Sequence, residues 1–286
     1  MRNPKVLLLG LAVGLLAGCG SAVPASSTAA PSPSGTPGSA AAAARNKPPK
    51  GRPVPGKPVR STSVPGKSGP TKPVRTKPRR AKKHTGPADS LIRTGRAGVA
   101  LTFDDGPDPV QTPKLLDLLR KEHVKATFCV VGRNVAAYPG LVRRIAAEGH
   151  TLCNHTWAHG LTLGRKKPAA IRADLARTNQ AIRRAAPGAK VRYMRAPGGN
   201  FTPAFVKAAA GLGMTSIYWQ VDPRDWEHPE GETATAHRAK VIRVVKKHVG
   251  KGAIVLSHDY RQPGTIAAYR TLLPWLRQRY RLIALP

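Results

Sequence analysis

The chain has 286 residues, with 48 Lys and Arg against 14 Asp and Glu, which gives a formal net charge of +34. All of its Phe, Trp and Tyr residues follow residue 97, so the first third cannot bury enough apolar surface to form a core. Residues 97–286 have the size of one ordinary domain. No apolar run reaches about 18 residues, which argues against a transmembrane protein. The low Cys content, 3 residues, argues against a disulfide scaffold.

The chain begins with the features of an export signal. Arg2 and Lys5 precede an apolar run of about 11 residues at 6–16, which matches a signal-peptide core and is too short to span a bilayer. The Leu-Ala-Gly-Cys sequence ending at Cys19 resembles the lipobox of bacterial lipoproteins, which implies cleavage after residue 18 and lipidation of the Cys19 thiol. We therefore expect an exported cell-membrane lipoprotein that faces the cell wall and is held by its lipid anchor. An uncleaved signal anchor and plain secretion are the alternatives.

Residues 19–96 have the composition of a linker. From residue 20 onward this segment contains 16 Lys and Arg and a single acid, Asp89, in a background of Pro, Gly, Ala and Ser. Repulsion between like charges and the polyproline tendency predict an extended, disordered basic tail. We expect the tail to contact an anionic envelope polymer or a lipid headgroup. The alternative is that the tail is only a spacer and that its charge keeps it solvated. A nucleic-acid partner does not fit an exported chain without interleaved aromatic residues.

Strand and helix patterns alternate through the rest of the chain. The sequence predicts strands at 98–103, 126–131, 150–154, 191–194, 216–221, 253–257 and 282–285. It predicts helices at 112–123, 141–148, 169–186, 203–212, 234–249 and 266–280. This alternation indicates an α/β fold with about seven parallel strands. We favour a closed or nearly closed (β/α) barrel over a doubly wound sheet, because no Gly-rich phosphate fingerprint follows the first strand.

Polar residues follow the carboxyl ends of these strands, the edge at which barrel enzymes carry their active sites. Adjacent carboxylates at Asp104 and Asp105 repel, so a buried pair needs a cation or a shared proton. One could bind a metal while the other accepts a proton, although a helix-capping acid pair is the alternative. His155 and His159 follow the third strand as an H-x-x-x-H, which on a helical turn presents both imidazoles to one ion. Two His and one carboxylate form a sensible Zn²⁺ site.

Three further segments carry candidate residues. Arg195 ends the fourth strand and could hold a carboxylate through bidentate hydrogen bonds, and the Gly-rich turn after it could direct N–H groups at an oxyanion. His258 ends the sixth strand, and a His paired with an acid can act as a general acid near neutral pH. Trp226 suits sugar stacking or core packing equally. We interpret the remaining histidines as surface or structural: His84, His123, His150, His228, His237 and His248.

Five motifs occur in order along residues 97–286: T-F-D-D-G-P, H-T-W-A-H, R-A-P-G-G, D-P-R-D-W and L-S-H. Together they resemble the polysaccharide deacetylase family, also known as the nodulation-protein-B homology domain and as carbohydrate esterase family 4. The resemblance implies a distorted (β/α) barrel and a hydrolase that removes acetyl groups from carbohydrates with a divalent metal, usually Zn²⁺.

The resemblance also implies a role for each matching residue. Asp104 is the general base, oriented by Arg195, and His258 is the general acid, tuned by Asp225. The implied metal ligands are Asp105, His155 and His159, and the implied substrate-binding residues are Pro197, Gly198, Trp226 and Leu256. The family often has an aromatic residue where this chain has Gly198. Gly198 still has a backbone N–H that can donate to the oxyanion, but the wall of the substrate groove loses a side chain. The substrate preference of other family members therefore does not transfer to this chain.

These features predict an envelope enzyme that removes N-acetyl groups from an amino sugar polymer, with peptidoglycan or a chitin-like oligosaccharide as the acetylated glycan. An O-acetyl esterase acting on a polysaccharide such as xylan and a non-catalytic wall-binding lipoprotein are the alternatives. Cys129 and Cys153 lie in neighbouring predicted strands and can form a disulfide in an exported chain, or remain as two buried thiols. The oligomeric state is not predicted.

Overall fold

The computed structural model describes residues 85–286. The predicted signal peptide, the predicted lipidation site at Cys19 and most of the predicted linker lie outside these residues.

A curved, all-parallel sheet of seven strands forms the centre of the domain, as predicted. Its strands follow the order β5-β4-β3-β2-β1-β6, and β7 pairs with β1. The strand bounds are β1 Val99–Asp104, β2 Thr127–Val130, β3 Thr151–Asn154, β4 Tyr193–Met194, β5 Thr215–Ser216, β6 Ile254–His258 and β7 Leu282–Ile283. The segment after β5 reaches back to β6 through a parallel bridge between Val221 and Val255, so the sheet curls toward a barrel.

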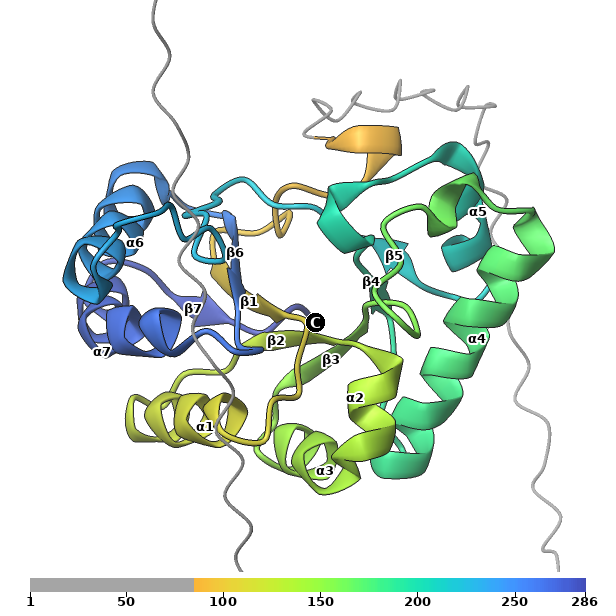
Figure 1. The fold of residues 1–286 in the computed structure, drawn as a ribbon, viewed down its shortest axis with the longest axis horizontal. Coiled ribbons are helices and arrows are strands. Elements are labelled where there is room, and N and C mark those ends of the chain that lie inside the picture. Colours follow the sequence, from red (N-terminus) through yellow and green to blue (C-terminus); the bar gives the residue numbers. More distant parts are fainter. Residues whose placement is uncertain (1–84) are drawn as a thin grey trace, which may run out of the picture. The chain divides into compact units, whose positions relative to one another are not determined.

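Helices cover the outside of this sheet (Figure 1). Their bounds are α1 Gln111–Lys121, α2 Gly132–Ala137, α3 Pro139–Ala147, α4 Pro168–Ala185, α5 Pro203–Ala210, α6 Ala234–His248 and α7 Pro263–Arg277. Six of them match the predicted helices, whereas α2 was not predicted. Within residues 85–286, no helix is both long and apolar enough to cross a membrane.

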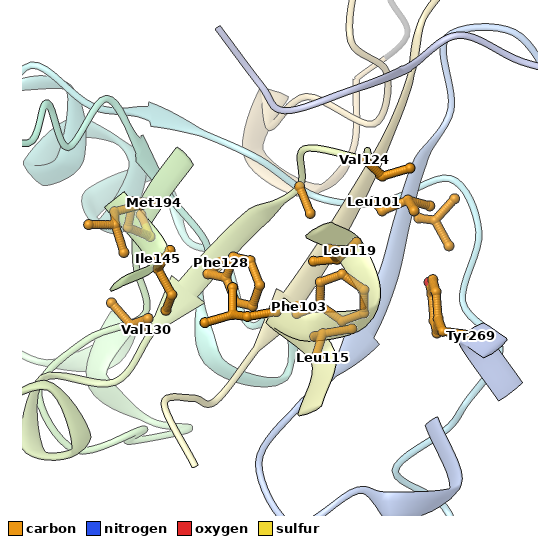
Figure 2. Packing of buried hydrophobic residues seen from close by; sticks show 14 of the residues in the cluster. Leu101, Phe103, Leu115, Leu119, Val124, Phe128, Val130, Ile145, Met194 and Tyr269 are labelled. Atoms are coloured by element: carbon orange, nitrogen blue, oxygen red, sulfur yellow. The ribbon is translucent and has the colours of Figure 1, made fainter. Parts of the chain in front are cut away.

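Alternation along β1 divides its side chains between two apolar clusters. Leu101 and Phe103 belong to the large outer cluster, between the sheet and the helices, and Ala100 belongs to a small inner cluster. In the outer cluster the Phe103 ring lies 5.5 Å from that of Phe128 and 5.0 Å from that of Tyr269, measured between centroids (Figure 2). Because side chains alternate along a strand, Asp104 shares the inner face with Ala100.

The inner cluster contains the disulfide between Cys129 and Cys153. These residues are direct partners in the parallel β2–β3 pairing, with Cα atoms 4.1 Å apart. Of the two alternatives for these cysteines, a disulfide or two buried thiols, the structure contains the disulfide. The bond joins the strand that pairs with β1 to the strand that precedes His155.

The end of the predicted linker needs a correction. Residues 85–96 pack against the domain, because Leu91 forms a parallel bridge with Ile217 and its amide donates to the Ser216 carbonyl at 2.9 Å. The Thr94 amide donates to the Gly252 carbonyl at 2.9 Å. Leu91 and Ile92 are the only adjacent large apolar pair near the end of this basic segment, too short a run to reveal the contact from sequence.

Candidate active site

The ends of β1, β3 and β6 bring polar residues to one cavity of about 500 Å³, and the end of β4 places Arg195 behind it. Asp104 ends β1 and pairs in register with His258, the last residue of β6. His155 directly follows β3, and Arg195 directly follows β4. Asp105 lies at the turn after β1. The carboxyl ends of parallel strands therefore assemble the predicted residues at one edge of the barrel.

A buried ion pair sits at the base of the cavity. Arg195 Nη1 donates to Asp104 Oδ1 at 2.7 Å and to Thr102 Oγ1 at 2.8 Å, and Nη2 donates to the Tyr218 carbonyl at 3.0 Å. Arg195 is fully buried, and Asp104 is 2 % exposed. Asp104 lines the cavity whereas Arg195 lies behind it, so the guanidinium holds the carboxylate from the interior.

Asp105 faces both imidazoles. Its Oδ1 lies 3.2 Å from His155 Nε2 and 3.1 Å from His159 Nε2, and Asp104 Oδ2 lies 3.7 Å from His155 Nε2. The predicted helical turn at 155–159 is wrong. This segment is a loop, because Thr156 has a φ of 66° and His159 a φ of 56°. The loop nevertheless brings both rings to one carboxylate, with their centroids 5.0 Å apart.

The short helix α2 supports this cluster. Asn134, on α2, donates to the Asp105 carbonyl at 2.7 Å, where Asp105 itself has a φ of 74°. The Gly132 amide at the start of α2 donates to the Thr156 carbonyl at 2.9 Å. Asn154 holds the other side of the loop, because its Oδ1 accepts from the Thr156 amide at 2.9 Å. Sequence reasoning missed these supporting residues, which have no pattern of their own.

The chemistry of Asp105, His155 and His159 fits a divalent metal. Each offers one donor atom, and these atoms lie within 4.8 Å of one another. His155 Nδ1 lies 2.8 Å from the Arg195 carbonyl, which accepts a hydrogen bond from the Nδ1–H, so the neutral ring has its lone pair on Nε2. Asp105 Oδ1 is buried and has no hydrogen-bond partner. Such an oxygen between two imidazole nitrogens is explained by a shared cation.

Electrostatics keep the Asp105 carboxylate ionised. Burial acts to raise its pKa, but the close approach of the His155 and His159 side chains and the charge of His155 outweigh burial and hold the pKa well below its usual range. An ionised carboxylate is the form that binds a metal.

A second His–carboxylate pair lies across the cavity. His258 Nδ1 lies 2.8 Å from Asp225 Oδ1, and the His258 amide donates to Asp225 Oδ2 at 2.8 Å. The Thr265 hydroxyl at the start of α7 also donates to Asp225 Oδ2, at 2.6 Å. Burial acts to lower the pKa of His258, but the hydrogen bond and charge of Asp225 raise it to about 9. His258 is therefore protonated at neutral pH. Thr265 is another residue that sequence reasoning missed.

The cavity walls include residues beyond the predicted set. Gly198, Trp226 and Leu256 line the cavity, whereas Pro197 is buried and does not line it. Leu161 and Trp219 are additional wall residues, and Leu161 and Trp226 expose 54 % and 46 % of their surface. The remaining lining residues are Ala196, Gly199, Asp222 and Arg224. The mouth of this acidic and imidazole-lined pocket is therefore partly apolar.

Comparisons with known proteins agree with this geometry. A family model described as polysaccharide deacetylase matches residues 92–217. A chitooligosaccharide deacetylase from Bradyrhizobium sp. (strain ANU 289) is 39% identical over 199 residues, which cover 65% of this chain and 87% of that relative. The chain belongs to the polysaccharide deacetylase family. This polysaccharide deacetylase is a hydrolase of N-acetyl amide bonds, and family members generally depend on a divalent metal.

Two further similarities bear on its activity. A peptidoglycan-N-acetylglucosamine deacetylase from Bacillus cereus is 33% identical over 195 residues, which cover 67% of this chain and 68% of that relative. A solved structure of a wild-type pseudoenzyme of carbohydrate esterase family 4 from Bacillus anthracis has a TM-score of 0.60 and 30% identity. That alignment covers 68% of this chain and 66% of the pseudoenzyme chain. Because the fold also occurs in a pseudoenzyme, activity must be argued from the site residues.

Proposed function

We propose that this protein is a metal-dependent N-deacetylase of an amino sugar polymer in the cell envelope, with peptidoglycan as the first candidate and chitin-like oligosaccharides as the second. One observation carries the proposal: Asp104, the cluster of Asp105, His155 and His159, and His258 all border the same cavity. A relative that acts on chitooligosaccharides and one that acts on peptidoglycan N-acetylglucosamine support the substrate class.

Asp105, His155 and His159 would hold the ion, which we assign as Zn²⁺ because two nitrogen donors and one oxygen donor suit that metal. When bound, a divalent ion supplies a Lewis acid for the acetyl carbonyl and makes water more acidic. The chain's own residues perform the proton transfers.

Asp104 is the general base of the proposed reaction. It lines the cavity beside the ligand cluster, yet its Oδ1 is held by Arg195 and its Oδ2 lies 3.7 Å from His155 Nε2. A carboxylate held in this way can accept the proton of the attacking water while staying in place. Arg195 is a positioning residue, because it contacts Asp104 and not the cavity.

His258 is the general acid. It lines the cavity, and Asp225 raises its pKa to about 9, against the effect of burial, so the ring carries a proton at neutral pH. That proton goes to the departing amine nitrogen as the C–N bond breaks, which releases acetate and leaves a free amino sugar. The Gly198 amide is our candidate donor to the oxyanion, and Trp226 and Leu256 are our candidates for contact with the acetyl and sugar groups.

The experiment that tests this function measures acetate release by the full chain from purified peptidoglycan, N-acetylated chitin oligomers and O-acetylated xylan. Each substrate is assayed with and without a chelator, and then after addition of Zn²⁺. We expect release from an N-acetylated substrate, its loss with chelator and its recovery with Zn²⁺. Release from xylan alone identifies an O-acetyl esterase. Release from no substrate by metal-loaded protein favours a wall-binding, non-catalytic protein.

For residues 1–84 we propose export, lipidation of Cys19 and contact of the basic tail with an anionic envelope polymer. The short apolar run at 6–16 and the Leu-Ala-Gly-Cys sequence support a lipoprotein signal. Fatty-acid labelling of the wild type and of Cys19→Ala tests it. We expect label in the wild type only, and equal labelling of both proteins would contradict lipidation at Cys19.

A further inference from the structure

The wall of the cavity has two exposed apolar side chains, and the proposed reaction assigns a contact to only one of them. Five large apolar residues within residues 85–286 are exposed, and two of these, Leu161 and Trp226, line the catalytic cavity. Trp226 belongs to one of the five ordered motifs. Leu161 belongs to none of them, although 54 % of its surface is exposed. Exposed apolar surface inside a groove is typical of a ligand-binding wall.

The turn after β4 supplies no side chain to this wall. Gly198 and Gly199 line the cavity with φ angles of 60° and 69°, in the left-handed region that favours glycine. Leu161 occupies the space beside the first, because a Cβ at Gly198 would lie 3.1 Å from Leu161 Cδ2. Trp219 occupies the space beside the second, because a Cβ at Gly199 would lie 2.8 Å from the Trp219 ring. Two residues from other segments therefore stand where this turn has no side chains.

Neighbouring groups hold both residues in place. The Leu161 carbonyl accepts a hydrogen bond from Asn200 Nδ2 at 3.1 Å, which joins its loop to the turn after β4. The Trp219 ring stacks on Tyr218, with centroids 3.8 Å apart and planes inclined by 14°. Leu161 also follows His159 by two residues, so this part of the wall lies next to the ligand cluster. A ligand that packs on Leu161 and Trp219 therefore meets a preformed apolar surface beside the reaction centre.

We propose that Leu161, together with Trp219, is a specificity-determining residue that packs against the apolar face of a sugar ring of the bound polymer. A pyranose ring presents C–H groups on its faces, and these groups are buried favourably against aliphatic and aromatic side chains. The contact selects a glycan over a small acetylated molecule, which reaches the catalytic groups without touching this wall. The inference rests on the proposed function, because it requires that the cavity bind an acetylated glycan.

The first test compares two substrates of the full, Zn²⁺-loaded chain. One is an N-acetylated chitin tetramer, and the other is p-nitrophenyl acetate, which has an acetyl group and no sugar. Leu161→Ala is expected to raise KM for the tetramer about five- to tenfold, because it removes apolar contact area, and to leave kcat nearly unchanged. Its rate on p-nitrophenyl acetate stays that of the wild type. Leu161→Met keeps the apolar area and restores KM to within about twofold of the wild type.

Val110→Ala is the matched control. Val110 is also 54 % exposed, but it lies just before α1 and does not line the cavity, so its substitution changes the kinetics of neither substrate. Circular dichroism and the Zn²⁺ content of each variant show that the fold and the ligand cluster are intact. An unchanged KM for the tetramer in Leu161→Ala overturns the inference. An equal loss of activity on p-nitrophenyl acetate overturns it as well, because the effect then does not depend on the sugar.

A binding measurement separates this inference from the proposed function. The chitin tetramer is titrated into the Asp104→Asn chain, in which hydrolysis is slowed, by isothermal titration calorimetry. Adding Leu161→Ala is expected to weaken binding by about five- to tenfold, and adding Val110→Ala leaves it unchanged. Equal affinities, or no binding of the tetramer, overturn the role of Leu161. Binding that depends on Leu161, with no acetate release by the wild type from any substrate, overturns the proposed deacetylase and supports the role of Leu161.

Discussion

Arg195 Nη1 donates to Asp104 Oδ1 across 2.7 Å inside the barrel, where both side chains are buried. This contact places the Arg195 guanidinium against the buried Asp104 carboxyl group at the base of the cavity. The Thr102 hydroxyl oxygen and the Tyr218 carbonyl accept further hydrogen bonds from the same guanidinium, so it has one orientation. The charge of Asp104 is thus compensated from the interior, and its cavity side stays free for substrate water.

Arg195→Met removes that compensation and leaves a buried carboxylate without a cation. We expect the free energy of unfolding to fall by about 3–5 kcal/mol, measured by urea denaturation at neutral pH. The double variant Arg195→Met/Asp104→Leu removes both charges and should regain most of this loss. If the single variant is as stable as the double variant, the ion pair does not hold Asp104 as described.

Asp225→Asn should move the alkaline limb of the activity profile. Asp225 raises the pKa of His258 to about 9 against the opposing effect of burial. Because His258 is the proposed general acid, activity should need the protonated ring and fall as pH rises through that pKa. Loss of the carboxylate charge lowers the pKa by about one unit or more, and the limb moves to lower pH. The measurement is kcat/KM against pH. The control is Asp117→Asn, at an exposed ion pair on α1, which should leave the limb in place.

Gly106→Ala should disturb the turn that carries Asp105. A Cβ at Gly106 would lie 2.5 Å from Asp259 Oδ1, and Asp259 is fully buried and accepts a hydrogen bond from Thr112. Because the carboxylate cannot move freely, we expect a loss of about 1–3 kcal/mol in unfolding free energy and weaker metal binding. Gly140→Ala on α3 meets nothing within 4 Å and should change neither. Equal stability and Zn²⁺ affinity for both variants would show that the turn tolerates the extra carbon.

Cys129→Ala/Cys153→Ala should lower the stability of the domain. The two residues are 24 positions apart, and a loop of this length corresponds to about 3 kcal/mol in the chain-entropy account. The midpoint of urea unfolding is the measurement, with reduced wild type as the comparison. The bond itself is checked by alkylating the unfolded, unreduced chain and mapping the labelled peptides by mass spectrometry. Label on both Cys129 and Cys153 would exclude the disulfide.

The strands and their polar ends were predictable for a physical reason. Buried strands need nearly continuous apolar runs, and Val99 to Phe103 form one that stops at Asp104. The loop after β3 was not predictable, because the positive φ angles at Thr156 and His159 depend on Asn154 and on the first amide of α2. Such contacts join distant segments, and an H-x-x-x-H spacing alone wrongly favours a helix.

Other features depended on register or on distant contacts. The pairing of Cys129 with Cys153 follows from the alignment of β2 and β3, which spacing along the chain does not determine. The six-residue helix α2 is too short to show a periodic pattern, yet its Asn134 supports Asp105. Thr265 acts on Asp225 from another element, 40 positions away. Residues that hold the site were therefore missed more often than residues that line it.

The most direct test of the account compares acetate release by Asp104→Asn with that of the wild type at equal, measured metal content. The account predicts that the variant binds as much Zn²⁺ as the wild type and that its kcat falls by about 10²–10⁴-fold, because Asp104 is the base and not a ligand. A variant that deacetylates at the wild-type rate with the same metal content would contradict this assignment.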